Sequence, residues 1–170
     1  RAETTSAVVR GGLPGIGASV GFELPGSPRP GVHLAGPGLA IGVRQSLPQE
    51  RRFRGGSASV AWTAGQLRLC PVRVLVGELV EVSPCAEANV GSLRVSGRGF
   101  SEARTVASAW FDVGGSLSTS VSLSDRIFLS STLLVTVPLV RQPFALRSGV
   151  NVASVPPRGV LGGLGLGVRW

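Results

Sequence analysis

Apolar residues alternate with small or polar residues at every second position through most of this chain. From Ala107 to Leu123 the odd positions are mainly apolar, and the even positions carry mainly Ser and Gly. The closing segment VLGGLGLGVRW places Leu164, Leu166 and Val168 on one face and almost only glycine on the other. Because successive side chains of a strand point to opposite faces, this period predicts β-strands with one apolar face. Mean hydropathy is high at +0.32. No apolar run reaches the ~18 residues of a transmembrane helix, which excludes that class.

Turn-forming residues divide the alternating segments into eight expected strands. The strands are expected near residues 4–12, 16–24, 32–44, 57–70, 85–96, 105–122, 127–142 and 159–170. Tight connections are expected at Gly77-Glu78, at Ser124-Asp125 and at 25–31. The opposite end carries the longer connections 44–56, 97–103 and 143–158 and the short segment 11–15. An even strand number with tight turns at one end and longer loops at the other is typical of membrane barrels. We therefore expect an all-β fold, an eight-stranded antiparallel up-and-down transmembrane β-barrel, with residues 1–170 as one domain.

The final strand, which ends at Trp170 with apolar residues at every second position before it, resembles the carboxy-terminal signature of bacterial outer-membrane barrels. Chain length and strand number are similar to those of the small eight-stranded group. The aromatic content differs, since the chain has no Tyr and has Trp only at 62, 110 and 170. The resemblance implies the outer membrane of a Gram-negative envelope, a mature chain with its signal peptide removed, and Trp170 as an anchor at the membrane interface. The alternative for this segment is an edge strand of a soluble sandwich.

The two cysteines are expected to form a disulfide. A two-residue turn at Gly77-Glu78 pairs residues whose numbers add up to 155, which places Cys70 opposite Cys85. The same register places Arg68 opposite Glu87 and proline opposite proline at 71 and 84. Three such pairings support one register, and a disulfide fits an oxidising compartment. It would contribute about 3 kcal/mol by loop closure. Two free buried thiols are the alternative.

Several charges fall on the faces expected to point into the barrel. They are Glu23, Arg44, Arg68, Glu87, Asp112 and Arg169. Because buried charges must pair, we expect a salt-bridge network that plugs the lumen. A narrow small-solute pore is the alternative.

All 17 basic residues are Arg, and the net charge is +8. Most of the excess lies on the side of the longer connections, where the expected contacts for lipid phosphates are Arg51, Arg52, Arg54, Arg98 and Arg104. Guanidinium groups suit bidentate phosphate contacts, such as those of lipopolysaccharide. A solvated loop cluster is the other interpretation. Because the Arg residues are dispersed and no nucleic-acid motif occurs, no nucleic-acid partner is expected.

Catalytic chemistry has little support in the sequence. The segment GASVG around Ser19 matches a nucleophile-elbow pattern, but it lies within a strand, and His33 is the sole histidine. Two cysteines and one histidine rarely make a metal site, and no cofactor is expected. We expect a non-enzymatic barrel that acts structurally, as an anchor or as an envelope-assembly subunit, with outer-membrane lipid, lipopolysaccharide and other envelope proteins as partners. The competing classes are a small-solute pore, a lipid-modifying enzyme and a soluble lipocalin-like carrier.

Overall fold

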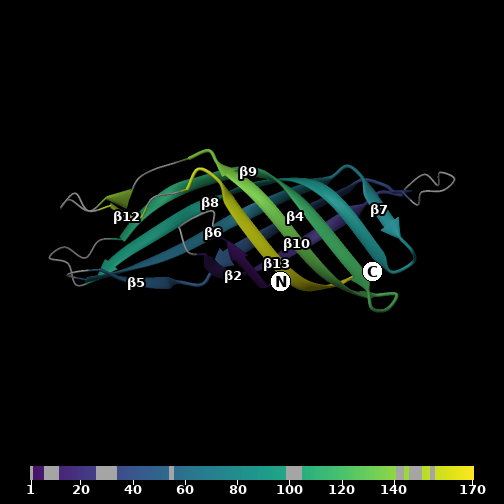
Figure 1. Cartoon of the computed structure of the whole chain (residues 1–170), viewed down its shortest axis with the longest axis horizontal. Helices are drawn as coiled ribbons and strands as arrows, with labels where there is room; N and C mark the ends of the chain where they lie inside the picture. Colours follow the sequence, from purple (N-terminus) through teal and green to yellow (C-terminus); the bar gives the residue numbers. More distant parts are fainter. Residues whose placement is uncertain are drawn as a thin grey trace.

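The computed structural model describes residues 2–5, 12–25, 34–53, 56–98, 105–140, 144–145, 151–153 and 156–170. Within these ranges the regular structure is entirely β, and eight antiparallel strands follow one another around a closed up-and-down barrel (Figure 1). The strands of the wall are β1 (Ala2–Thr5), β2 (Leu13–Glu23), β4 (Gly38–Ser46), β6 (Gly56–Cys70), β8 (Val80–Arg98), β9 (Thr105–Ser122), β10 (Ile127–Pro138) and β13 (Gly159–Val168). Strand β1 pairs with both β13 and β2 and so closes the wall. The predicted all-β fold with eight antiparallel strands in an up-and-down barrel is confirmed. None of the described residues form a helix that is long and apolar enough to cross a membrane.

Short strands lengthen the hairpins at both ends of the barrel. At the end of the tight turns, called the turn end here, β3 (Leu34–Ala35) pairs with β7 (Arg73–Val76), and β7 pairs with β8. At the opposite loop end, β5 (Gln49–Phe53) pairs with β6, and β11 (Phe144–Ala145) pairs with β12 (Asn151–Ala153). Figure 1 shows β7 near one end of the long axis and β5 and β12 near the other.

Much of the connection expected at 44–56 is therefore strand. Pairing between β5 and β6 continues to Phe53 and Gly56, and β8 also begins earlier than expected, at Val80. The sequence QERRF of β5 has no apolar alternation that could have marked it. Strand pairing depends on backbone hydrogen bonds, so a polar segment extends a hairpin wherever its partner strand continues.

The first two strands begin earlier than the sequence pattern suggested. Strand β1 occupies Ala2–Thr5 instead of 4–12, and residues 6–11 lie outside the described residues. Strand β2 begins at Leu13, directly after Gly12, whose φ of 76° is in the left-handed region that favours glycine. The segment expected as the connection 11–15 thus belongs largely to β2.

The two faces of the barrel wall have inverted chemistry over its turn-side half. Outward side chains are apolar and exposed, as at Leu166 (71%) and Phe22 (64%). Inward side chains include charged groups that are almost fully buried, as at Arg44 (1%) and Glu87 (3%). The alternation expected for 16–24, 107–123 and 127–139 is confirmed, with the apolar set outside.

Glycine allows neighbouring strands to approach closely where the wall curves. At Gly114, which faces inward on β9, a Cβ atom would lie far inside van der Waals contact of the Val135 carbonyl oxygen on β10. A Cβ atom at Gly91 on β8 would likewise lie far inside van der Waals contact of the Thr63 carbonyl oxygen on β6. A small barrel needs such bends because eight strands must turn through a full circle.

We predict that Gly114→Ala destabilises the barrel, because the Val135 carbonyl belongs to a strand that cannot move aside. Overpacking of this kind costs about 1–3 kcal/mol. The free energy of unfolding in urea, measured in detergent micelles, checks this. The matched control is Gly115→Ala, because a Cβ there meets nothing within 4 Å. Equal stability of the two variants would contradict the curvature argument.

Candidate functional site

The lumen holds the densest set of polar contacts in the described part of the chain, and these contacts are centred on Glu87. Its carboxylate accepts hydrogen bonds from Arg44 Nη2 at 2.9 Å and Arg68 Nε at 2.7 Å. Gln66 Nε2 and Ser116 Oγ donate to the same carboxylate at 2.9 and 2.8 Å. The Glu87 side chain has no solvent exposure. Two guanidinium groups and two neutral donors together replace the water that a buried carboxylate loses.

The network extends from Arg44 on β4 to residues of β1, β8 and β9. Arg44 Nε lies 3.3 Å from Glu3 of β1, and Arg44 Nη1 donates to Asn89 Oδ1 at 3.4 Å. Asn89 in turn donates to Asp112 at 2.7 Å, and the indole N–H of Trp110 donates to the other oxygen of Asp112. Four of the six charges expected to point inward, Arg44, Arg68, Glu87 and Asp112, are therefore brought together in one network.

The other two expected charges, Glu23 and Arg169, lie in a second cluster at the turn end. Arg73 Nη1 lies 2.6 Å from Glu23 and 3.4 Å from Glu81, and Arg73 Nε donates to the Gly36 carbonyl at 2.8 Å. Arg169 Nη2 lies 3.7 Å from Glu81. The two clusters thus form separate charged layers across the lumen.

Sequence reasoning missed the members of these layers that lay near the expected strand boundaries. Glu3 preceded the expected first strand, and Arg73 and Glu81 fell inside the expected hairpin tip. Asn89 could have been found, because it lies two positions from Glu87 and therefore on the same face of β8.

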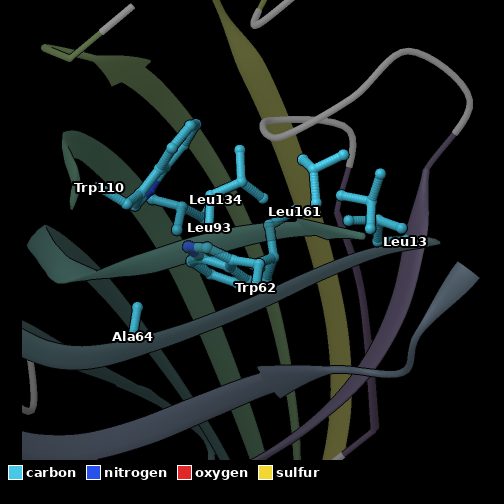
Figure 2. Close-up of a cluster of buried hydrophobic side chains, with 9 residues drawn as sticks. Leu13, Trp62, Ala64, Leu93, Trp110, Leu134 and Leu161 are labelled. Atoms are coloured by element: carbon cyan, nitrogen blue, oxygen red, sulfur yellow. The ribbon is translucent and has the colours of Figure 1, made fainter. Parts of the chain in front are cut away.

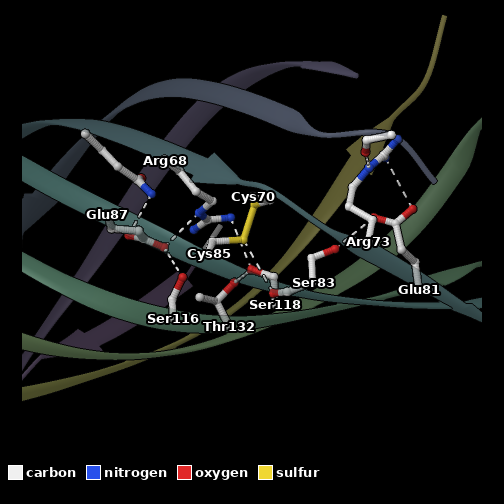
Figure 3. Close-up of a disulfide and its surroundings, with 12 residues drawn as sticks. Arg68, Cys70, Arg73, Glu81, Ser83, Cys85, Glu87, Ser116, Ser118 and Thr132 are labelled. Carbon is white, nitrogen blue, oxygen red and sulfur yellow. Dashed lines mark hydrogen bonds and ion pairs between the residues drawn. A yellow bond between two sulfur atoms is a disulfide. The ribbon is translucent and has the colours of Figure 1, made fainter. Parts of the chain in front are cut away.

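The disulfide joins β6 and β8 between the two charged layers. Cys70 and Cys85 are bonded, with Cα atoms 4.1 Å apart, and both are buried. Figure 3 shows the bond flanked by Glu87 and Ser116 on one side and by Arg73 and Glu81 on the other. The predicted disulfide is confirmed, as is the predicted pairing of Arg68 with Glu87.

The hairpin beyond the disulfide differs from the expectation. Val76 pairs with Val80, which leaves a three-residue turn at Gly77–Leu79 in place of the two-residue turn at Gly77-Glu78. Partner numbers add up to 155 between β6 and β8 and to 156 between β7 and β8, so the register shifts by one residue. The shift lies next to Pro71, which cannot donate a ladder hydrogen bond.

The bare glycine face of the last strand also has a structural role. The Phe128 ring of β10 lies against Gly167 of β13, where any Cβ atom would collide with the ring. The Arg169 guanidinium stacks over the same ring, with Cζ 5.0 Å from its centroid. Gly17 on β2 is similar, because a Cβ there would lie 3.1 Å from Glu3 Oε1. Glycine thus leaves the interior free for the larger side chains of neighbouring strands.

An apolar cluster fills the lumen towards the loop end. Its members are Leu13, Val60, Trp62, Ala64, Leu93, Val95, Trp110, Leu134 and Leu161. Figure 2 shows these side chains converging from several strands. Trp62 and Trp110 meet edge to face, with centroids 6.4 Å apart. Trp110 also donates to Asp112, so the apolar cluster and the central network are in direct contact.

The other residues singled out from the sequence lie outside the lumen network or outside the described residues. Ser19 lies within β2, and this strand context differs from the strand–turn–helix that a nucleophile elbow requires. Trp170 follows β13 and is 96% exposed. The side chains of Arg51, Arg52 and Arg98 fall outside the described residues, although their backbones belong to β5 and β8; Arg54, Arg104 and His33 fall outside entirely.

The central network of the lumen holds paired charges that are buried from solvent. Among the described residues, no group of three or more His, Cys, Asp or Glu side chains is arranged to hold a metal ion. No protein-family model matches the chain, and no curated protein is similar to it.

We predict that Glu87→Ala lowers the free energy of unfolding by about 3–5 kcal/mol, because it leaves two buried guanidinium groups without their shared carboxylate. Fluorescence of the buried Trp62 and Trp110 during urea unfolding is the measurement. Glu78→Ala, in the exposed turn, is the matched control and should change stability by less than about 0.5 kcal/mol. A loss as small for Glu87 as for Glu78 would show that the central network contributes little.

Proposed function

We propose that this chain is a membrane-spanning barrel of the bacterial outer membrane. In this proposal it acts without catalysis, as a structural element, an anchor or a subunit of an envelope assembly. Its side-chain-filled lumen supports this role, and its outer surface supports the membrane location.

A reversal of side-chain pattern along β6 and β8 carries the proposal. On the turn side, β6 directs Leu67 and Leu69 outward and Gln66 inward. On the loop side of the same strand, Ser59 and Thr63 point outward, whereas the inward positions are apolar.

Strand β8 changes at the same level as β6. Val90 points outward and Asn89 inward on the turn side, whereas Ser92 and Arg94 point outward and Leu93 inward on the loop side. Thr63 pairs with Ser92, so the two strands reverse next to one another. A wall that faces lipid needs apolar residues outside, and a wall that faces water needs them inside. A boundary between lipid and water at the level of Thr63 and Ser92 accounts for the side-chain pattern on both the turn side and the loop side of the two strands.

The apolar exterior also argues against a soluble lipocalin-like carrier. Large apolar side chains cover the turn-side exterior, including Leu39 (44%), Ile41 (55%) and Val43 (61%) on β4. Soluble proteins rarely expose apolar patches that continue over several strands. Trp170, which follows β13, is exposed, as expected of an aromatic anchor at a membrane interface.

The layered interior favours a closed barrel over a small-solute pore. The central network and the apolar cluster occupy successive levels of the lumen, and eight strands leave an interior that side chains fill. We therefore propose an anchoring or assembly role, in which the exterior and the loops make the functional contacts.

Lipopolysaccharide is the proposed partner at the loop end. Arg94, which the sequence-based set did not include, points outward on β8 just beyond the apolar band. An outward guanidinium at this level stands where lipid phosphates are expected, and its fork geometry suits them. The Arg residues at 51, 52, 54, 98 and 104 remain candidates for the same contact.

The membrane location predicts that Ile41→Arg impairs insertion, because Arg on the lipid face near the bilayer centre costs about 2–4 kcal/mol. The fraction that refolds into phospholipid vesicles, measured by flotation and by heat-modifiable migration on gels, checks this. Ser59→Arg, outward but beyond the reversal, is the matched control and should insert normally. A wild-type chain that stays a monodisperse monomer without detergent would overturn the membrane proposal.

The proposed lipopolysaccharide contact predicts that Arg94→Ala weakens binding by about tenfold, the effect of losing one charge-assisted hydrogen bond. Titration of the detergent-solubilised barrel with purified lipopolysaccharide at fixed salt is the measurement. Arg126→Ala removes the same charge from the exposed turn at the other end of the barrel and serves as control. If both variants bind alike, Arg94 does not contact the lipid.

A further inference from the structure

Strand β1 closes the barrel over only part of its height. Its ladder with β2 runs from Thr5 opposite Leu13 to Ala2 opposite Ile16. Its ladder with β13 ends at Ala2 opposite Leu164. Both neighbouring strands continue further towards the turn end, β2 to Glu23 and β13 to Val168.

Among the described residues, these continuations pair on one side only. Ala18–Glu23 of β2 pairs with β4, and Leu166–Val168 of β13 pairs with β10. The unpaired edges of these two segments face one another across the line along which β1 would continue. Since strands in a sheet lie about 4.8 Å apart, the two edges bound a slot the width of one strand, about 10 Å across.

Burial agrees with an open slot at this place. Ser19 and Gly21 face the lumen on β2, yet both are exposed. Ser83, which faces the lumen on β8 between two paired neighbours, is only 5% exposed. The lumen-facing side of β2 thus meets solvent where its neighbour strand is missing.

The slot lies within the apolar band of the exterior. Its outward neighbours are Val20 (46%) and Phe22 (64%) on one edge and Leu166 (71%) and Val168 (60%) on the other. In hydrocarbon a strand edge has no water to bond its N–H and C=O groups, so open edges are strongly disfavoured there. A spanning barrel therefore requires a strand in this slot.

We infer that the slot is a strand-binding site, and that its occupant is an extended polypeptide segment continuing β1 on the amino-terminal side of Arg1. The inference rests on the proposed membrane location. β1 lies directly on the loop side of the slot and points along its axis. A continuation of β1 therefore runs antiparallel to both edges of the slot. A covalent continuation also orders only its own residues, whereas a separate chain loses translational and rotational freedom on binding.

The register specifies the chemistry of the occupant. Partner numbers add up to 18 between β1 and β2 and to 166 between β1 and β13. The first, third and fifth residues before Arg1 then lie beside Ala18, Val20 and Phe22, on the outward face. The second, fourth and sixth lie beside Ser19, Gly21 and Glu23, on the lumen face. The occupant is thus a six-residue strand with apolar side chains outward and polar ones inward.

The test compares the chain beginning at Arg1 with two forms that carry six added residues directly before Arg1. The matched extension is Thr-Val-Ser-Val-Gln-Leu, and the control, Val-Thr-Val-Ser-Leu-Gln, turns the apolar side chains inward. Amide hydrogen exchange of the vesicle-inserted protein is followed by mass spectrometry. We expect residues 18–23 and 166–168 to exchange at least tenfold more slowly with the matched extension alone, and residues 39–43 of β4 to stay unchanged.

Cross-linking tests the register independently of stability. A cysteine at the third position before Arg1 should form a disulfide with Val20→Cys on β2, its direct partner, but not with Ala18→Cys. Mass spectrometry confirms in each sample that Cys70 and Cys85 remain bonded to one another. Formation of the Ala18 cross-link in preference to the Val20 one would overturn the register.

The remaining outcomes separate this inference from the proposed function. Protection of residues 18–23 in the monomeric chain without extension, or equal protection by both extensions, overturns the slot. Protection that rises with protein concentration, together with a cross-linked dimer through Val20→Cys, assigns the slot to a second copy and overturns the continuation of β1. Flotation of the same samples tests the membrane location. Protein that floats but gains no protection refutes the slot alone, and protein that fails to float refutes the membrane location.

Discussion

A closed wall of eight strands limits the width of the lumen, and the rest of this structure follows from that limit. Such an interior is wide enough for side chains and too narrow for bulk solvent around each charge. Arg44 and Arg68 therefore need acceptors within the lumen, and they share one of them, Glu87. The same limit separates the interior into layers, because apolar side chains cannot fill the level that the charged groups occupy. Charge pairing, apolar packing and backbone curvature are thus consequences of strand number.

Glycine has two separate roles in meeting this limit. At Gly114 the absence of a side chain lets β9 approach the backbone of β10, which bends the wall. At Gly167 it makes space for the Phe128 ring, which itself supports the Arg169 guanidinium. The first role concerns the curvature of the wall, and the second concerns the packing of side chains inside the lumen. A composition rich in glycine is therefore compatible with a well-specified barrel, even though isolated glycine weakens strands.

The alternation of apolar residues and the register of the cysteines predicted most of the barrel. They failed in polar segments, at strand ends and at the register shift. The alternation from 107 to 123 identified both faces of β9, and the match of Cys70 with Cys85 supported by Arg68 with Glu87 set the register of two long strands. β5 was missed because strand pairing there is carried by the backbone under polar side chains. The roles of Glu3 and Arg73 were missed because each lies where a strand ends or shifts register, and face assignment by counting requires an uninterrupted strand. The reversal along β6 needed burial on both faces of one strand, which a sequence pattern does not contain.

The one-residue register shift beside the disulfide has a consequence for the turn end. Along β6 the even-numbered side chains, such as Gln66 and Cys70, point into the lumen. After Pro71 and Val72 the parity is reversed, and odd-numbered Arg73 points inward with 6% exposure. Without the extra residue, Arg73 would face the apolar exterior, and Glu23 and Glu81 would lose the cation that lies between them. A single added residue in the backbone thus determines on which side of the barrel wall a positive charge resides.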